Sequence, residues 1–142
     1  MQYLSPEWIE AAGRALASDP SLKEATSSVG LTLEHVVTEA PDGVGDDGTV
    51  RWHVRVDHGE VALVGGPAEH ADVRFTTDYA TAAGVAAGRV GAQRAFADGR
   101  LTVGGDVLAL AGSQKAFAAV QDTLAGLRSE TTFPAVPSAA SR

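Results

Sequence analysis

Histidine and carboxylate side chains could do chemistry in this 142-residue chain, and their spacing decides which chemistry is open to them. The four histidines are His35, His53, His58 and His70. A metal site needs several convergent ligands, and no pair of these histidines has that spacing on one predicted element. His35 stands among the inward-facing residues of a strand, where a hydrogen-bonded histidine is favoured over a catalytic base. An enzyme that uses His35 or His53 with a nearby carboxylate stays open as an alternative.

Two glycine-containing stretches match catalytic signatures but lack the elements that those signatures need. Residues 43–48 have the letters of a dinucleotide-binding loop. No helix is predicted to follow them, however, and their aspartates would repel a pyrophosphate. Ser113 lies inside the predicted last helix and lacks the second glycine of a nucleophile elbow. We therefore predict a protein that is not an enzyme and that has no catalytic residues, no metal and no cofactor.

The composition excludes further function classes. The chain has no cysteine, which rules out disulfides, thiolate metal sites and a cysteine nucleophile. Its net charge of −7 argues against nucleic-acid binding and allows at most transient membrane contact. We see neither a secretion signal nor a window of about 18 apolar residues that could span a bilayer, so a cytoplasmic location is expected. A high Ala, Gly, Val and Arg content with two lysines is typical of a GC-rich bacterial genome.

The elements that must position any site follow from the hydrophobic periodicity. Period-two alternation predicts five strands, over residues 29–40, 50–57, 60–64, 72–77 and 100–104. Apolar stripes and capping residues predict four helices, over residues 6–18, 79–87, 92–98 and 107–127. This order predicts one α+β domain over residues 1–128, with a five-stranded, mainly antiparallel sheet and helices packed on one face. Residues 129–142 have no periodicity and are predicted to be a mobile C-terminal tail.

Six aromatic side chains are open to two interpretations. They could fill a packed core, or they could line an apolar ligand cavity, and regular apolar spacing alone favours the core. These residues are Trp8, Trp52, Phe75, Phe96, Phe117 and Phe133.

A longer pattern runs from Ala71 to Leu110. Ala71-Asp72 opens a strand, and Asp78 caps the helix that follows it. Further along, Ala95-Phe96 precedes the last strand and helix, which begin within residues 99–106, Gly-Arg-Leu-Thr-Val-Gly-Gly-Asp. In these residues the chain resembles the sterol carrier protein type-two (SCP-like sterol-binding) family, and the resemblance extends over roughly residues 4 to 127. It implies an apolar tunnel between sheet and helices that carries fatty acyl, sterol-like or polyketide-like ligands without doing chemistry on them.

The resemblance also implies which side chains line this tunnel. By position they are inward-facing strand residues and helix residues, namely Trp52, Val54, Phe75, Phe96, Leu101, Val103, Leu108, Phe117 and Val120. No charge is needed there, because burying an alkyl chain yields about 0.8 kcal/mol per CH₂. Gly104-Gly105-Asp106 is expected to serve backbone geometry and helix capping rather than ligand contact. The implied partner is a lipid or another apolar small molecule; the alternative is an accessory or protein-interaction module with a filled core and no ligand.

Overall fold

The five predicted strands form in a computed structural model of the chain, which describes residues 1–42 and 44–133. The strands are β1 (Gly30–Thr38), β2 (Val50–Asp57), β3 (Glu60–Gly65), β4 (Val73–Asp78) and β5 (Leu101–Gly105). The helices are α1 (Pro6–Ser18), α2 (Pro20–Ala25), α3 (Tyr79–Ala86), α4 (Ala92–Ala97), α5 (Val107–Ala111) and α6 (Gln114–Ala125), followed by the 3₁₀ turn η1 (Arg128–Glu130).

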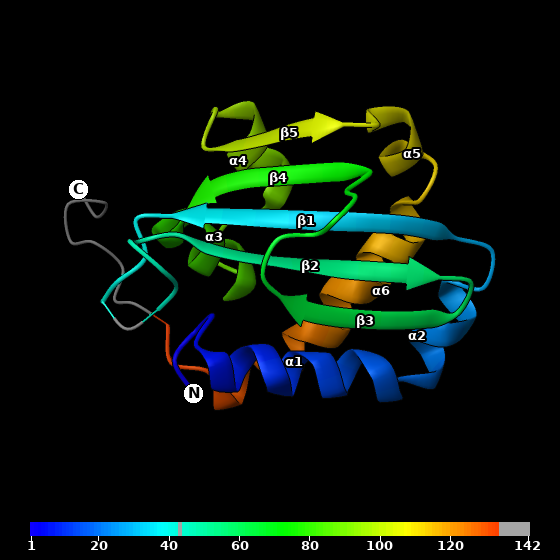
Figure 1. Cartoon of the computed structure of the whole chain (residues 1–142), viewed down its shortest axis with the longest axis horizontal. Helices are drawn as coiled ribbons and strands as arrows, with labels where there is room; N and C mark the ends of the chain where they lie inside the picture. Colours follow the sequence, from blue (N-terminus) through cyan, green and yellow to red (C-terminus); the bar gives the residue numbers. More distant parts are fainter. Residues whose placement is uncertain (43, 134–142) are drawn as a thin grey trace.

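The strands form one sheet in the order β3-β2-β1-β4-β5. β1 and β4 pair in parallel, and the other three neighbouring pairs are antiparallel. Figure 1 shows α3, α4 and α6 behind this sheet, with α1 running beside β3. The predicted α+β class, with a mainly antiparallel sheet covered by helices on one face, is confirmed.

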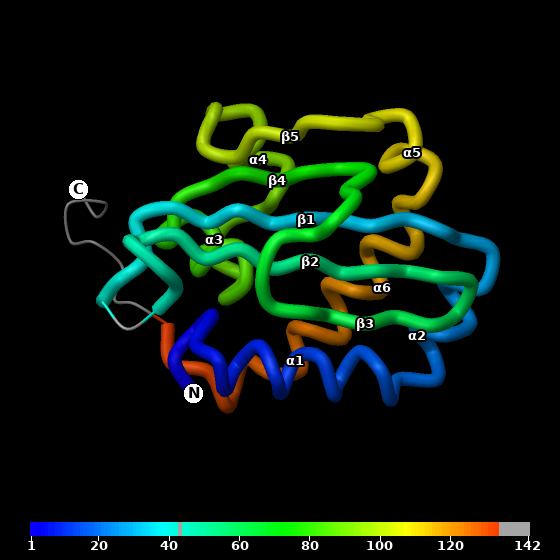
Figure 2. Tube along the Cα trace, viewed as in Figure 1, coloured from blue at the N-terminus to red at the C-terminus, as the bar shows by residue number. Residues whose placement is uncertain are grey.

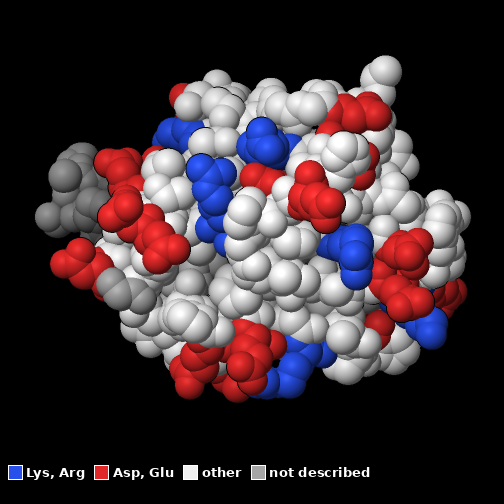
Figure 3. All heavy atoms as spheres, viewed as in Figure 1, with Lys and Arg blue, Asp and Glu red and all other residues white. Residues whose placement is uncertain are grey.

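The opposite face of the sheet carries the charged side chains. On β2, Trp52 and Val54 are buried toward the helices, while Arg51 and Arg55 alternate with them and are exposed. Figure 3 views this outer face and shows acidic and basic side chains interspersed over it. In the part of the chain that the structure describes, none of the helices has both the length and the hydropathy needed to cross a bilayer.

The N-terminal helices begin and end at capping residues. The Ser5 hydroxyl accepts the backbone N–H of Trp8 at 3.2 Å, which satisfies one of the free donors in the first turn of α1. Asp19 ends α1, as predicted, but its carboxylate also accepts the N–H groups of Ser21 and Leu22 and so caps a second helix. α2 was not predicted from the sequence, because six residues are too few to show a helical periodicity.

The single last helix predicted over residues 107–127 is wrong, because two helices occupy this stretch. α5 ends at Ala111 with Gly112 as its C-cap, and Ser113 at φ −119° precedes the first residue of α6. Glycine and serine are weak helix formers, so a break in the helix at these residues costs little free energy. Leu110 and Phe117 nevertheless pack against the same buried cluster on opposite sides of the break. The apolar stripe is therefore continuous across a break that periodicity alone could not reveal.

The Gly104-Gly105-Asp106 turn has the role that was expected of it. Gly105 lies at φ +91°, and a Cβ atom there would collide with the carbonyl oxygen of Asp72. The Asp106 carboxylate accepts the N–H of Ala109 at 3.0 Å and caps α5. Backbone geometry and capping thus account for this part of the motif.

The two ends of the described chain lie side by side, as Figure 2 shows. Gln2 and Thr132 form a parallel bridge, and the Phe133 ring lies 5.5 Å from that of Tyr3. Residues 129–133, which were predicted as the start of a mobile tail, therefore pack onto the N-terminal segment. The rest of that predicted tail, residues 134–142, lies outside the described residues.

Candidate ligand-binding cavity

A cavity of about 550 Å³ lies between the inner face of the sheet and the elements that cover it. Side chains from β1, β2, β4 and β5 line one side, and α3, α4, α5 and α6 supply the other. Most of the lining is aliphatic or aromatic, and all six aromatic residues singled out in the sequence contribute to it. A pocket of this size and character is of the kind that holds a small apolar ligand.

The nine predicted tunnel residues fall into three groups. Six of them line the cavity: Trp52, Phe75, Phe96, Leu101, Val103 and Phe117. Val54 and Val120 instead belong to the packed core, in one cluster with residues of α1 and α2. Leu108 is 85% exposed on α5, a helix of five residues none of which is buried. Ligand contact by any of the nine stays a prediction.

Three rings lie in a row on the floor of the cavity, because the strand register places them there. His35 on β1 is the direct partner of Trp52 on β2 and of Phe75 on β4. The His35 imidazole stacks on the Trp52 indole with ring centroids 3.9 Å apart and an interplanar angle of 1°. Its other neighbour is the Phe75 ring at 5.0 Å, which in turn lies 5.6 Å from Phe117. Such aromatic contacts add to the stability gained from burial.

His35 is not the hydrogen-bonded histidine that the sequence predicted. Among the described residues no group hydrogen bonds to its ring, whose partners are the two flanking aromatic rings. Part of the imidazole faces the cavity, but it is shielded from bulk water, and this burial lowers its pKa to about 3. The Trp52 indole Nε1–H is buried, and within the described residues it has no hydrogen-bond partner.

Residues from the two ends of the described chain also line the cavity. Tyr3, Trp8 and Phe133 come together there, with the Tyr3 ring 5.1 Å from that of Trp8. The Tyr79 hydroxyl donates to the Tyr3 carbonyl oxygen at 2.7 Å, and burial raises the pKa of both tyrosines. Periodicity could not have found this wall, because it forms only when residues 1–8 and 131–133 meet.

The cavity reaches the surface at a rim of exposed side chains. Phe96 on α4 and Val107 on α5 line it but remain 57% and 54% exposed. Asp122 and Arg128 also contribute to the lining, and both are exposed. Arg128 is held in place by its Nε–H, which donates to the carbonyl oxygen of Ala86 at 2.6 Å. The charged lining residues thus lie at the rim, whereas the floor is made of uncharged rings.

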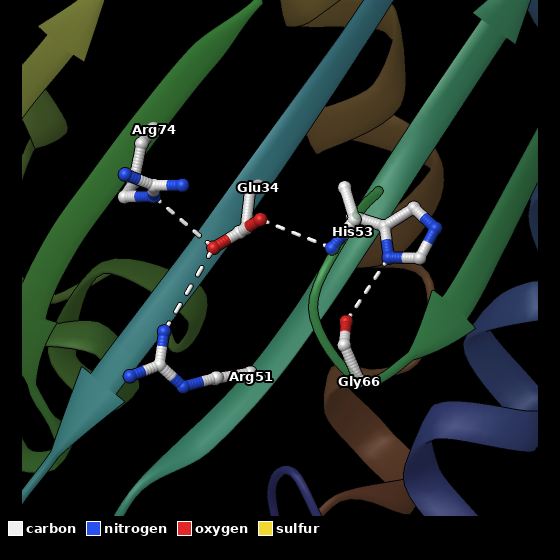
Figure 4. Close-up of polar contacts among 6 residues, drawn as sticks. Glu34, Arg51, His53, Gly66 and Arg74 are labelled. Atoms are coloured by element: carbon white, nitrogen blue, oxygen red, sulfur yellow. Dashed lines mark hydrogen bonds and ion pairs between the residues drawn. The ribbon is translucent and has the colours of Figure 1, made fainter. Parts of the chain in front are cut away.

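The outer face of the sheet holds a separate polar cluster around Glu34 (Figure 4). The Glu34 side chain is only 2% exposed; it accepts the N–H of Ala68 at 3.0 Å and Arg74 Nε–H at 3.1 Å, with Arg51 at 3.9 Å. These contacts hold the connection between β3 and β4 against the sheet. His53 Nδ1 lies 3.0 Å from the carbonyl oxygen of Gly66 instead of pairing with Glu34.

Neither histidine of the enzyme alternative has the partner that it would need. Within residues 1–42 and 44–133, no contact joins a carboxylate to the ring of His35 or His53. The same residues contain no group of three His, Asp or Glu side chains that could hold a metal ion. The arrangement on the cavity side is suited to burying an apolar molecule, which requires shape and apolar surface rather than a proton relay.

Comparison with known proteins gives one family and several similar structures. A model of the SCP-2 sterol transfer family matches residues 10–118. A crystal structure of sterol carrier protein 2 has a TM-score of 0.70 at 24% identity, covering 87% of this chain and 98% of its own. A conserved hypothetical protein from Thermus thermophilus, described as possibly a sterol carrier protein, has a TM-score of 0.67 at 26% identity, with coverages of 95% and 94%. Palmitated SCP2L2 from Aedes aegypti has a TM-score of 0.55 at 20% identity, with coverages of 79% and 94%. No curated protein sequence matches the chain.

Proposed function

Since the chain belongs to the SCP-2 sterol transfer family, whose model matches residues 10–118, we propose that it binds and carries an apolar chain-like molecule without catalysing a reaction. The observation that carries this proposal is the apolar cavity of about 550 Å³ between sheet and helices. A protein-interaction module with a filled core would not need such a space. The ligand class we propose is fatty acyl or polyketide-like.

The volume of the cavity suits a long alkyl chain. Its volume of about 550 Å³ lies within the range of about 300–1,000 Å³ that small-molecule sites have. A methylene group takes up about 30 Å³, so the cavity has room for a chain of roughly eighteen carbons. The similar Aedes aegypti protein is described as palmitated, and a palmitoyl chain is shorter than this.

The rim supplies a route for exchange. Phe96 and Val107 are apolar, exposed and continuous with the cavity, so a chain can enter without crossing a polar barrier. Exposed apolar side chains of this kind commonly mark ligand grooves or contact sites. Arg128 and the glutamines Gln93 and Gln114 complete the rim, where a polar end group of the ligand could stay hydrated.

A chain-length series tests the proposal. The protein would be purified, stripped of lipid and titrated with straight-chain carboxylic acids of increasing length by displacement of a fluorescent fatty acid. Each added CH₂ that enters the cavity should tighten binding by about 0.8 kcal/mol, or about fourfold, until the cavity is full. Absence of binding across the whole series at micromolar protein, together with no copurifying ligand in native mass spectra, would favour the filled-core interaction module.

Two substitutions on α3 provide a matched pair for this series. Ala82 lines the cavity, whereas Ala80 on the same helix is exposed. Ala82→Phe should place a ring in the ligand space, weaken binding and move the plateau to shorter chains. Ala80→Phe adds the same ring outside the cavity and should leave the series unchanged. Equal effects of the two variants would contradict the assignment of this cavity as the ligand site.

A further inference from the structure

The floor of the cavity contains a polar group that apolar ligand binding alone does not explain. His35 lies midway along β1 with its ring exposed to the cavity, in a lining that is otherwise mostly aliphatic or aromatic. The residue is half-buried, and in the described part of the chain no hydrogen bond joins its ring to another group. Its nitrogens are therefore open to a partner that enters the cavity, and a polar group in an apolar site is usually hydrogen bonded.

The stacking geometry explains why His35 and Trp52 cannot satisfy each other. The N–H bonds of imidazole and indole rings point outward in the ring plane. The two rings are parallel to within 1° at a centroid distance of 3.9 Å, so neither N–H is directed at a nitrogen of the other ring. Phe75 on the other side of His35 has no polar atom to offer. The edges of the imidazole remain the positions at which a hydrogen bond can form.

We propose that the His35 imidazole hydrogen bonds an uncharged polar group of the ligand, a hydroxyl or a carbonyl, which the apolar chain carries to the cavity floor. This inference rests on the proposed function and narrows its ligand class to chains that bear a neutral oxygen function away from the rim. The neutral imidazole offers one N–H donor and one nitrogen acceptor, and so matches either group.

An ionised carboxylate is excluded from the position beside His35, because its surroundings there are uncharged. The flanking groups are uncharged rings, and the cavity's charged lining residues, Asp122 and Arg128, are exposed at the rim. Burial keeps the imidazole neutral at physiological pH, because its pKa lies at about 3. A carboxylate moved next to His35 would lose its hydration without gaining a cation, which is strongly unfavourable. A carboxylate end group therefore belongs at the rim, and a hydroxyl or carbonyl at the floor.

The test compares dodecan-1-ol with dodecane, two chains of equal length that differ in one hydroxyl. Both would displace a fluorescent fatty acid from the wild-type protein, from His35→Phe and from His70→Phe. His35→Phe keeps an aromatic ring between Trp52 and Phe75 but removes both ring nitrogens. His70 is exposed on the connection between β3 and β4, and its substitution is the matched control.

His35→Phe removes one hydrogen bond to the ligand, so it should weaken dodecan-1-ol binding roughly three- to tenfold. Dodecane binding should change less than twofold, and His70→Phe should change neither. In wild-type protein with ¹⁵N-labelled histidine, dodecan-1-ol but not dodecane should shift the ring nitrogens of His35. This second measurement decides the question even if His35→Phe fails to fold.

Two results would overturn the inference, and they are distinguishable. If wild-type protein binds both compounds, but His35→Phe affects them equally or the His35 nitrogens respond equally to both, the hydrogen bond is refuted and the proposed function stands. If wild-type protein binds neither compound and no chain of any length, the proposed function fails and the inference fails with it.

Discussion

Lowering the pH from 7.5 to 5 should destabilise this fold through His35. Burial lowers the pKa of His35 from 6.5 to about 3 in the folded protein. Between these values the unfolded chain binds a proton that the folded protein excludes, so stability rises with pH across this window and is lost as the pH falls below about 6.5. Each pH unit inside the window changes the free energy of unfolding by about 1.4 kcal/mol. At pH 5 the His35 contribution should amount to a loss of about 2 kcal/mol.

Urea unfolding followed by tryptophan fluorescence, repeated at pH steps from 7.5 to 5, measures this loss. His35→Phe retains a ring between Trp52 and Phe75 but cannot bind a proton, so its stability should fall by about 2 kcal/mol less than that of the wild type over the range. His70→Gln, an exposed substitution of the same residue type, should keep the wild-type slope. Parallel pH profiles for the wild type and His35→Phe would refute the reasoning, because they would show that the imidazole is not shielded from water.

Two further predictions concern the framework around the cavity. Glu34→Ala should lower the free energy of unfolding by about 1–3 kcal/mol in urea titrations, because it leaves the Ala68 N–H without its acceptor. Fatty-acid affinity should stay unchanged in that variant, since Glu34 faces away from the cavity, and a large loss of affinity would contradict this placement. Gly105→Ala should lower the free energy of unfolding by about 1–3 kcal/mol in thermal unfolding experiments. The reason is that φ is +91° and the added Cβ meets the carbonyl of Asp72. Gly104→Ala, whose Cβ would have open space, is the control, and equal losses in the two variants would count against backbone strain at Gly105.

Local physics made most of the elements predictable. Alternation of apolar and polar residues located every strand, because the side-chain period of a strand is two wherever one face is buried. Capping at Ser5, Asp78 and Asp106 located the starts of three helices, since their carboxylates or hydroxyl satisfy free backbone N–H groups there. α2 and the break at Gly112-Ser113 were missed, because a short helix shows no period and the break does not interrupt the apolar stripe.

The residues of the candidate site were predictable only as a class. Strand alternation placed Trp52, Val54 and Phe75 on one face but could not tell which of them pack against helices and which face a gap. Val54 is buried in the packed core, whereas Trp52 and Phe75 line the cavity. That difference depends on how the helices pack over the sheet, which the period of the sequence does not contain.

The sequence by itself determined the fold class, the family resemblance and the exclusion of thiol chemistry, because these depend on residue types and on short-range spacing. Only the tertiary structure decided the chemistry of the cavity. Strand register brought His35 between Trp52 and Phe75, and the meeting of the chain ends brought Tyr3 against Phe133. Both depend on contacts between residues far apart in the chain. A cavity is the space that packed side chains leave between them, so it is set by the way whole elements pack and not by any one segment.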